Sequence, residues 1–112
     1  MDKYEFNIKV EQIKKLVNKS DYETAMKIAD TIDWRRVRNV NILSMVAGIY
    51  EKNGEFQEAK DILLLAFERA PIGKRLLYKL ADLALKEGNV EEAEDYSVAE
   101  SGGELEDLLN PE

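Results

Sequence analysis

Two residue types that carry much of protein chemistry, cysteine and histidine, are absent from all 112 residues. Without cysteine the chain cannot form disulfides or use a thiolate, and without histidine it lacks the base of Ser–His–Asp and Cys–His enzymes. Because these two residue types build most zinc sites, we expect no metal and no cofactor. No apolar run is long enough to span a bilayer, and the start Met1–Phe6 is polar. The composition therefore predicts one soluble, cytoplasmic domain without membrane contact.

Other catalytic constellations are also missing. The sequence has no Gly-rich phosphate loop. Carboxylate pairs occur, such as Glu91/Glu92 and Glu94/Asp95, but they are typical of an exposed helix face where nothing would raise a pKa. We therefore expect a protein that is not an enzyme.

Basic residues are missing from the end of the chain. Residues 87–112 contain ten acids and no base, whereas residues 1–86 contain all 16 Lys and Arg against 13 acids. The net charge of −7 thus averages a mildly basic body with a strongly acidic end. Such asymmetry is often found in interaction tails, although a solvated terminal helix is the simpler interpretation.

A short basic cluster, Arg35, Arg36 and Arg38, follows the single tryptophan, Trp34. Basic clusters can bind phosphates or nucleic acid, but this one has no interleaved aromatic residues and lies in an acidic protein. We therefore expect no nucleic-acid partner. We expect Trp34 to be a wedge between the second and third helices rather than a ligand platform, and Asp33 to cap the third helix.

The chain does contain a pattern that returns every 34 residues. Its clearest copy has the landmarks Leu43, Val46, Ala47, Tyr50, Gly54, Phe56, Ala59, Leu63, Ala66 and Pro71. One step later stand Leu77, Leu80, Ala81, Ala84, Gly88, Val90 and Ala93, and one step earlier stand Ser20, Tyr22 and Ala25. Gly54 is suited to end one helix, because glycine accepts a positive φ, and Pro71 to end the next. A period of this length is the signature of stacked helical repeats.

Residues 6–100 resemble the tetratricopeptide repeat, most closely from Val40 to Gly73. The resemblance implies an all-α fold: a right-handed solenoid of three helical hairpins, about six helices, in residues 1–100. A Gly hinge and acidic tail follow in residues 101–112, where Leu105, Leu108 and Leu109 predict a short capping segment.

Helical periodicity and capping signals place the six helices. They should run from about Lys3 to Asn18, from a capping box at Ser20 and Glu23 to about Ile32, from Asp33 to Lys52, from Glu55 to Arg69, from Lys74 to Glu87 and from Val90 to Glu100. The first helix should bury the stripe Tyr4, Ile8, Ile13, Leu16 and Val17. The fourth should expose Glu58 and Lys60.

The resemblance also implies a function and a site. In this family the first helix of each hairpin lines a concave groove that holds a peptide. Carried onto this chain, the groove residues are Asn7, Val10, Lys14, Asn41, Met45, Lys52, Arg75, Tyr78, Lys79 and Lys86. Basic side chains beside adaptable apolar ones predict a protein or peptide ligand with acidic and apolar residues. The expected function is a non-catalytic interaction module, such as an adaptor or scaffold.

Some members of the family clamp a C-terminal carboxylate with two Lys, two Asn and an Arg. Arg75 and Lys79 match that set in charge, but Val10, Lys14 and Met45 depart from it. We therefore do not expect this ligand.

Two alternatives stay open. The ends of a solenoid can stack, so the chain could serve assembly instead, as a homodimer or as the end of a longer array. The tail could cap the last two helices, or fold back into a groove through the Gly102-Gly103 hinge.

Overall fold

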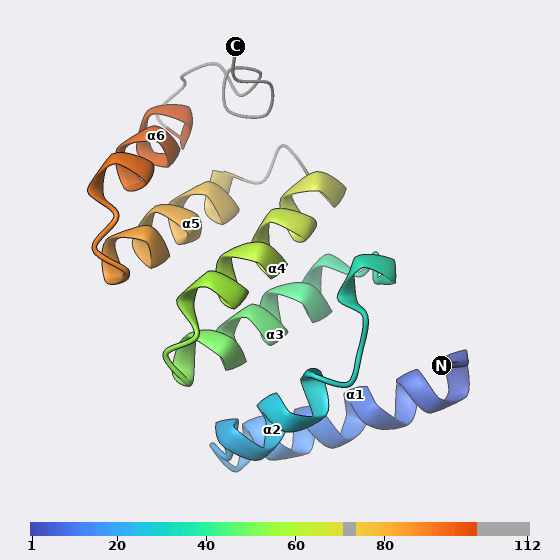
Figure 1. Cartoon of the computed structure of the whole chain (residues 1–112). Coiled ribbons are helices and arrows are strands. Elements are labelled where there is room, and N and C mark those ends of the chain that lie inside the picture. The colour runs from blue at the N-terminus through green and yellow to red at the C-terminus, as the bar shows by residue number, and fades with distance from the viewer. Residues whose placement is uncertain (71–73, 101–112) are drawn as a thin grey trace.

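The computed structural model describes residues 1–70 and 74–100, and the regular elements of these residues are all helical (Figure 1). They are α1 (Lys3–Asn18), α2 (Tyr22–Ala29), the short 3₁₀ helix η1 (Trp34–Arg36), α3 (Val40–Lys52), α4 (Phe56–Arg69), α5 (Lys74–Lys86) and α6 (Val90–Glu100). Helices adjacent in sequence pack against each other, which gives an elongated stack of 40 × 27 × 20 Å. The predicted all-α fold of helical hairpins is confirmed. The break predicted at Pro71 and the tail in residues 101–112 lie outside the described residues.

The three hairpin turns share one backbone geometry. Ser20, Gly54 and Gly88 have positive φ angles of 59°, 76° and 83°. The N–H of the next residue then donates to a carbonyl five residues earlier, from Asp21 to Leu16, from Glu55 to Tyr50 and from Asn89 to Ala84, each at 2.9 Å. This hydrogen bond is the mark of a Schellman helix end. The period in the sequence therefore corresponds to a repeated backbone conformation.

The helix that follows each turn carries an alanine at the same step. Ala25, Ala59 and Ala93 are all buried. A side chain this small leaves room for the two helices of each hairpin to pack closely. These alanines therefore occupy matching positions in the three pairs.

The start of α2 differs from its prediction by one residue. Asp21, not Ser20, caps the helix by accepting a hydrogen bond of 3.2 Å from the N–H of Thr24. The predicted capping box of Ser20 and Glu23 is wrong, because Ser20 takes the left-handed conformation of the turn.

The connection between α2 and α3 also differs from its prediction. Helix α2 ends at Ala29, three residues before the predicted end at Ile32. Asp33 caps η1 rather than α3, with its carboxylate accepting from the N–H of Arg35 at 3.2 Å. Asn39 caps α3 by a hydrogen bond that its side chain accepts from a backbone N–H in the first turn.

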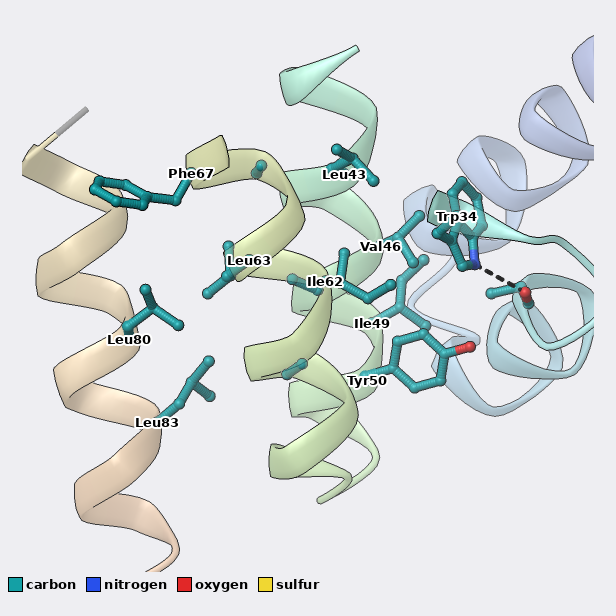
Figure 2. Packing of buried hydrophobic residues seen from close by; sticks show 14 of the residues in the cluster. Trp34, Leu43, Val46, Ile49, Tyr50, Ile62, Leu63, Phe67, Leu80 and Leu83 are labelled. Carbon is teal, nitrogen blue, oxygen red and sulfur yellow. Dashed lines mark hydrogen bonds between the residues drawn. The ribbon is translucent and has the colours of Figure 1, made fainter. Parts of the chain in front are cut away.

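Side chains explain why α2 stops early. The Thr31 hydroxyl donates to the carbonyl of Ile28 at 2.7 Å. The indole N–H of Trp34 donates to the carbonyl of Ala29 at 3.0 Å (Figure 2). Because these bonds satisfy the last carbonyls of α2, the helix needs no further turn. Trp34 is buried between α2 and α3, as the sequence predicted.

The buried face of α1 is not the predicted stripe. Tyr4 and Ile8 are 75 % and 43 % exposed, whereas Val10 and Ile13 are 4 % and 0 % exposed. An α-helix turns about 100° per residue, so Tyr4 lies on the opposite side of α1 from Ile13. The predicted stripe is therefore wrong, because it combined residues from opposite sides of α1.

A continuous apolar core extends along the stack. It extends from Ile13 on α1 to Tyr96 on α6, and Figure 2 shows its central part around α3, α4 and α5. Its fully buried large side chains are Ile13, Leu43, Val46, Ile49, Phe67, Leu77, Leu80 and Leu83. Both sides of α4 are covered, by α3 and by α5, which agrees with the apolar residues on more than one side of this helix.

Lys60 on α4 was predicted to be exposed, and this prediction is wrong. Its side chain lies in the interior, where its ammonium group pairs with Glu87 in the α5–α6 turn and with Glu92 in α6. Two carboxylates can compensate the loss of water around a buried ammonium group. Glu92 is therefore a half-buried partner of a buried lysine rather than a solubilising surface acid.

None of the helices in the described ranges combines the length and the apolarity that crossing a bilayer requires.

Candidate protein-binding face

The candidate residues of α3 and α5 are exposed or half-buried, and Met45 among them packs against the core. Along α3, Asn41 and Lys52 are exposed and Met45 is half-buried. Along α5, Arg75 is exposed and the ring of Tyr78 is 70 % exposed. We call these residues, together with Lys79 and Lys86, the α3–α5 face.

A carboxylate from α3 joins the two helices of this face. The Nζ atom of Lys79 lies 2.6 Å from Oε1 of Glu51, and Lys86 pairs with the other oxygen of the same carboxylate. Asp82 on α5 lies beside both lysines, with Oδ2 at 3.8 Å from Lys79 and 3.2 Å from Lys86. Two carboxylates therefore already neutralise two of the cations that the sequence predicted for a ligand.

The environment of Glu51 holds it in the charged form. Its side chain is only 13 % exposed, and this burial by itself would raise its pKa. Hydrogen bonds from Lys79 and Lys86, together with their positive charges, outweigh the burial and leave the pKa of Glu51 below its ordinary value. The α3–α5 face thus contains a stable internal ion cluster.

Sequence reasoning missed Glu51 as a member of this face. The one signal in the sequence was that Glu51 directly precedes Lys52, which was a predicted groove residue. Which lysines Glu51 would meet depends on where the stack places α5 relative to α3, and helical spacing within α3 does not contain that information.

The candidate residues of α1 take different places. Val10 is buried in the core, and Lys14 is exposed and lies 3.5 Å from Oε1 of Glu11. Asn7 is exposed near the connection between α2 and α3. Within residues 1–70 and 74–100, no ion pair or side-chain hydrogen bond joins Asn7 or Lys14 to the α3–α5 face. The structure therefore joins the candidate lysines of α5 to α3 through Glu51, whereas the candidates of α1 lie apart.

Lys52 leans away from α5. Its ammonium group lies 5.8 Å from the centre of the Tyr22 ring on α2, within the range of a cation–π interaction. The amide of the neighbouring Asn53 donates to the carbonyl of Tyr22 at 3.0 Å. Lys52 therefore marks the side of the face nearest the first helix pair.

Comparison with known proteins bears on the central hairpin. Residues 40–72 match the family model described as tetratricopeptide repeat, and this segment includes α3, α4 and the turn between them. No curated protein matches the chain. Members of this family are generally non-enzymatic and act in protein–protein interaction. The tetratricopeptide repeat is thus matched by the α3–α4 hairpin, and the helix pairs before and after this hairpin lie outside the matched segment.

Proposed function

We propose that the α3–α5 face binds a polypeptide partner that carries acidic and apolar side chains. One observation carries the proposal: the ring of Tyr78 is largely exposed next to the basic residues Arg75 and Lys79. Tyrosine and arginine are enriched among residues that dominate binding energy at protein interfaces. The Tyr78 ring could contact an apolar side chain of the ligand, while Arg75 and Lys79 contact carboxylates on either side of it.

The ion cluster limits how strongly such a ligand binds. A ligand carboxylate would compete with Glu51 and Asp82 for the ammonium groups of Lys79 and Lys86. Among the described residues no carboxylate pairs with Arg75, so it is the cation that a ligand would engage first. We therefore propose that Arg75 and Tyr78 are the main contacts and that the lysines add selectivity for acids.

A peptide array of acidic and apolar sequences, followed by titration of the best binder, tests this proposal. The variant R75Q/Y78A should lower affinity by at least about tenfold, because it removes a cation and an aromatic anchor. A matched control, K15Q/Y4A, removes the same kinds of side chain from exposed positions on α1. Equal affinities for the two variants would show that the α3–α5 face is not the binding site.

We further propose that the α1–α2 and α5–α6 pairs are diverged copies of the matched repeat. The shared turn geometry of Ser20, Gly54 and Gly88 supports this relationship. The buried alanines at the same step in α2, α4 and α6 support it independently.

Self-association is the second candidate function. Apolar side chains are exposed at both ends of the stack, Tyr4 and Ile8 on α1 and Leu85 and Val90 in the last pair. Light scattering over a range of concentrations separates the two functions. A stable dimer would favour assembly, and a monomer at all concentrations would favour the interaction module.

A further inference from the structure

A hollow of about 820 Å³ lies between the start of α1 and the connection that joins α2 to α3. Figure 1 shows this connection near the N-terminus of the chain. Apart from Asn7, none of its lining residues was a predicted site residue. Its volume is within the range of about 300–1,000 Å³ that is typical of ligand pockets.

The hollow lies where the first helix pair departs from the geometry of the second. Helix α2 has 8 residues, whereas α4 has 14. One 34-residue step relates residues 30–35 to 64–69, so the connection and η1 take the place of the last turns of α4. A long connection instead of helical turns leaves space beside α1. The hollow is therefore a specific feature of the first pair rather than of the repeat.

Its floor is apolar. The lining includes Phe6 from α1 and the buried side chains of Ile32 and Val37 from the connection. The Phe6 ring packs edge-on against Trp34, with ring centres 6.3 Å apart and an interplanar angle of 68°. Because Trp34 is also held by its hydrogen bond to Ala29, this floor is anchored in the core.

Three basic side chains, Lys3, Arg36 and Arg38, also line the hollow. Within the described parts of the chain, no ion pair joins any of the three to a carboxylate. Arginine in particular can hold a carboxylate through two parallel hydrogen bonds. The rim thus offers positive charge next to an apolar floor.

The acids of the lining are engaged within the chain. Asp2 accepts a hydrogen bond of 2.7 Å from the N–H of Glu5 and caps α1. Asp33 accepts two hydrogen bonds from the Arg35 guanidinium, at 2.9 Å and 3.1 Å, and the first cause of its lowered pKa is this pairing. Asp33 therefore stays ionised and paired with Arg35, and it neutralises Arg36 and Arg38 less than an unpaired acid would.

We propose that this hollow is a second binding site, for a peptide segment that places a carboxylate next to an apolar side chain. The apolar side chain would rest on Phe6 and Val37, and the carboxylate would accept hydrogen bonds from Arg36 or Arg38. A peptide suits the site better than a nucleic acid does, because the floor is apolar and can hold an apolar side chain. The site does not depend on the α3–α5 face.

Trp34 provides a direct reporter, because it is the only tryptophan in the chain and contacts the floor through Phe6. The full-length chain without an added N-terminal tag is titrated with a five-residue peptide of alternating glutamate and leucine. We expect a saturable change in tryptophan emission. The glutamine counterpart of the peptide should bind at least about tenfold more weakly, because it lacks the charge that the arginines recognise.

Variants locate the binding. R36Q/R38Q should weaken the peptide by at least about tenfold, while the matched pair K15Q/K19Q should change it less than about twofold, since charge–charge steering alone is weak in salt. N7F, which narrows the hollow without a change of charge, should also weaken binding. R75Q/Y78A should leave the tryptophan titration unchanged, so failure of the α3–α5 proposal and failure of this one are distinguishable. Melting curves confirm that each variant is folded.

Three results would overturn the proposal. The first is no saturable change in emission up to millimolar peptide. The second is an equal effect of R36Q/R38Q and K15Q/K19Q. The third is an oligothymidylate that produces the same emission change at a lower concentration than the peptide, which would assign the hollow to nucleic acid.

Discussion

The Nζ atom of Lys60 lies 2.9 Å from Oε2 of Glu92, and this contact fastens the last helix to α4 through a buried charge. Glu87 supplies a second carboxylate, and the amide of Asn89 donates to Glu92 at 2.8 Å. Burial alone would lower the pKa of Lys60, but the hydrogen bonds to Glu87 and Glu92 outweigh it and raise that pKa. An ion cluster thus joins the third helix pair to the second from inside the stack.

Removing both carboxylates should destabilise the protein more than removing the lysine. E87Q/E92Q leaves a buried ammonium group without a counter-charge, a change that typically costs about 3–5 kcal/mol. K60M should cost less, because the two carboxylates keep about a quarter of their surface in water and a methionine fills the space. Urea unfolding measures both.

The control for this pair is E91Q/E94Q, which removes the same charge from exposed positions of α6. It should change the free energy of unfolding by less than about 0.5 kcal/mol. If K60M proved the more damaging variant, the role assigned to the buried ion cluster would be wrong.

The left-handed turn residues predict that glycine at position 20 stabilises the protein and that alanine at position 54 destabilises it. S20G should stabilise the protein by about 0.5 kcal/mol, because Ser20 takes a left-handed conformation that glycine adopts at lower cost. G54A should destabilise it by about 1 kcal/mol for the same reason. A Cβ at Gly54 would meet no atom within 4 Å, so backbone strain and not collision would be the cause. Thermal melts of the two variants should shift in opposite directions.

Gly48 is the matched control for these turns. It lies inside α3 with a helical backbone and equally open surroundings. G48A should therefore stabilise by up to about 1 kcal/mol, as alanine does in a helix interior. A loss of stability in G48A as large as that in G54A would contradict the explanation by φ.

The ion pairs of Glu51 predict how the stability of the folded protein changes as the pH falls. Its pKa is lowered in the folded protein, so its contribution to stability is complete above the ordinary glutamate value of 4.5 and is lost as the pH falls through the lowered pKa. E51Q should remove this part of the acid sensitivity, which unfolding curves between neutral pH and pH 3 would show. If the unsubstituted protein and E51Q lost stability in parallel as the pH fell, Glu51 would not be the group responsible for the acid sensitivity.

E51Q also tests the proposed competition at the α3–α5 face. With Lys79 and Lys86 released from Glu51, an acidic peptide bound there should gain affinity by several-fold. The neighbouring variant E55Q changes an exposed acid in the next turn and should have little effect. An unchanged affinity in E51Q would mean that the ligand does not use these lysines.

The hydroxyl of Tyr50 donates to Oδ1 of Asp30 at 2.7 Å and connects the first helix pair to the second. Burial is the main cause of the raised pKa of Tyr50, so the hydroxyl keeps its proton and stays a donor across the usual pH range. Y50F should cost about 1–2 kcal/mol, since the acceptor is charged but partly exposed. Y4F, at an exposed position, serves as the control and should leave urea unfolding unchanged.

The sequence by itself determined where the helices and turns of this protein lie and which chemistry is open to it. The 34-residue period, with Gly54 and Gly88 at the turns, predicted the hairpins, and the bounds of α1 were predicted correctly. These features depend on helical spacing and on the φ that a turn requires, and both are properties of a short segment. The absence of cysteine and histidine likewise restricted the chemistry before any fold was known.

Only the tertiary structure decided which side chains meet across helices. Lys60 became an interior cation because α6 brings Glu92 to it, and Glu51 neutralises Lys79 because the stack places the end of α3 within reach of α5. The hollow beside α1 arises because Trp34 satisfies the end of α2 and the chain takes another path to α3. Helical periodicity gives the angle of a residue around its own helix, whereas these contacts depend on the angle and distance between helices, which no short segment specifies.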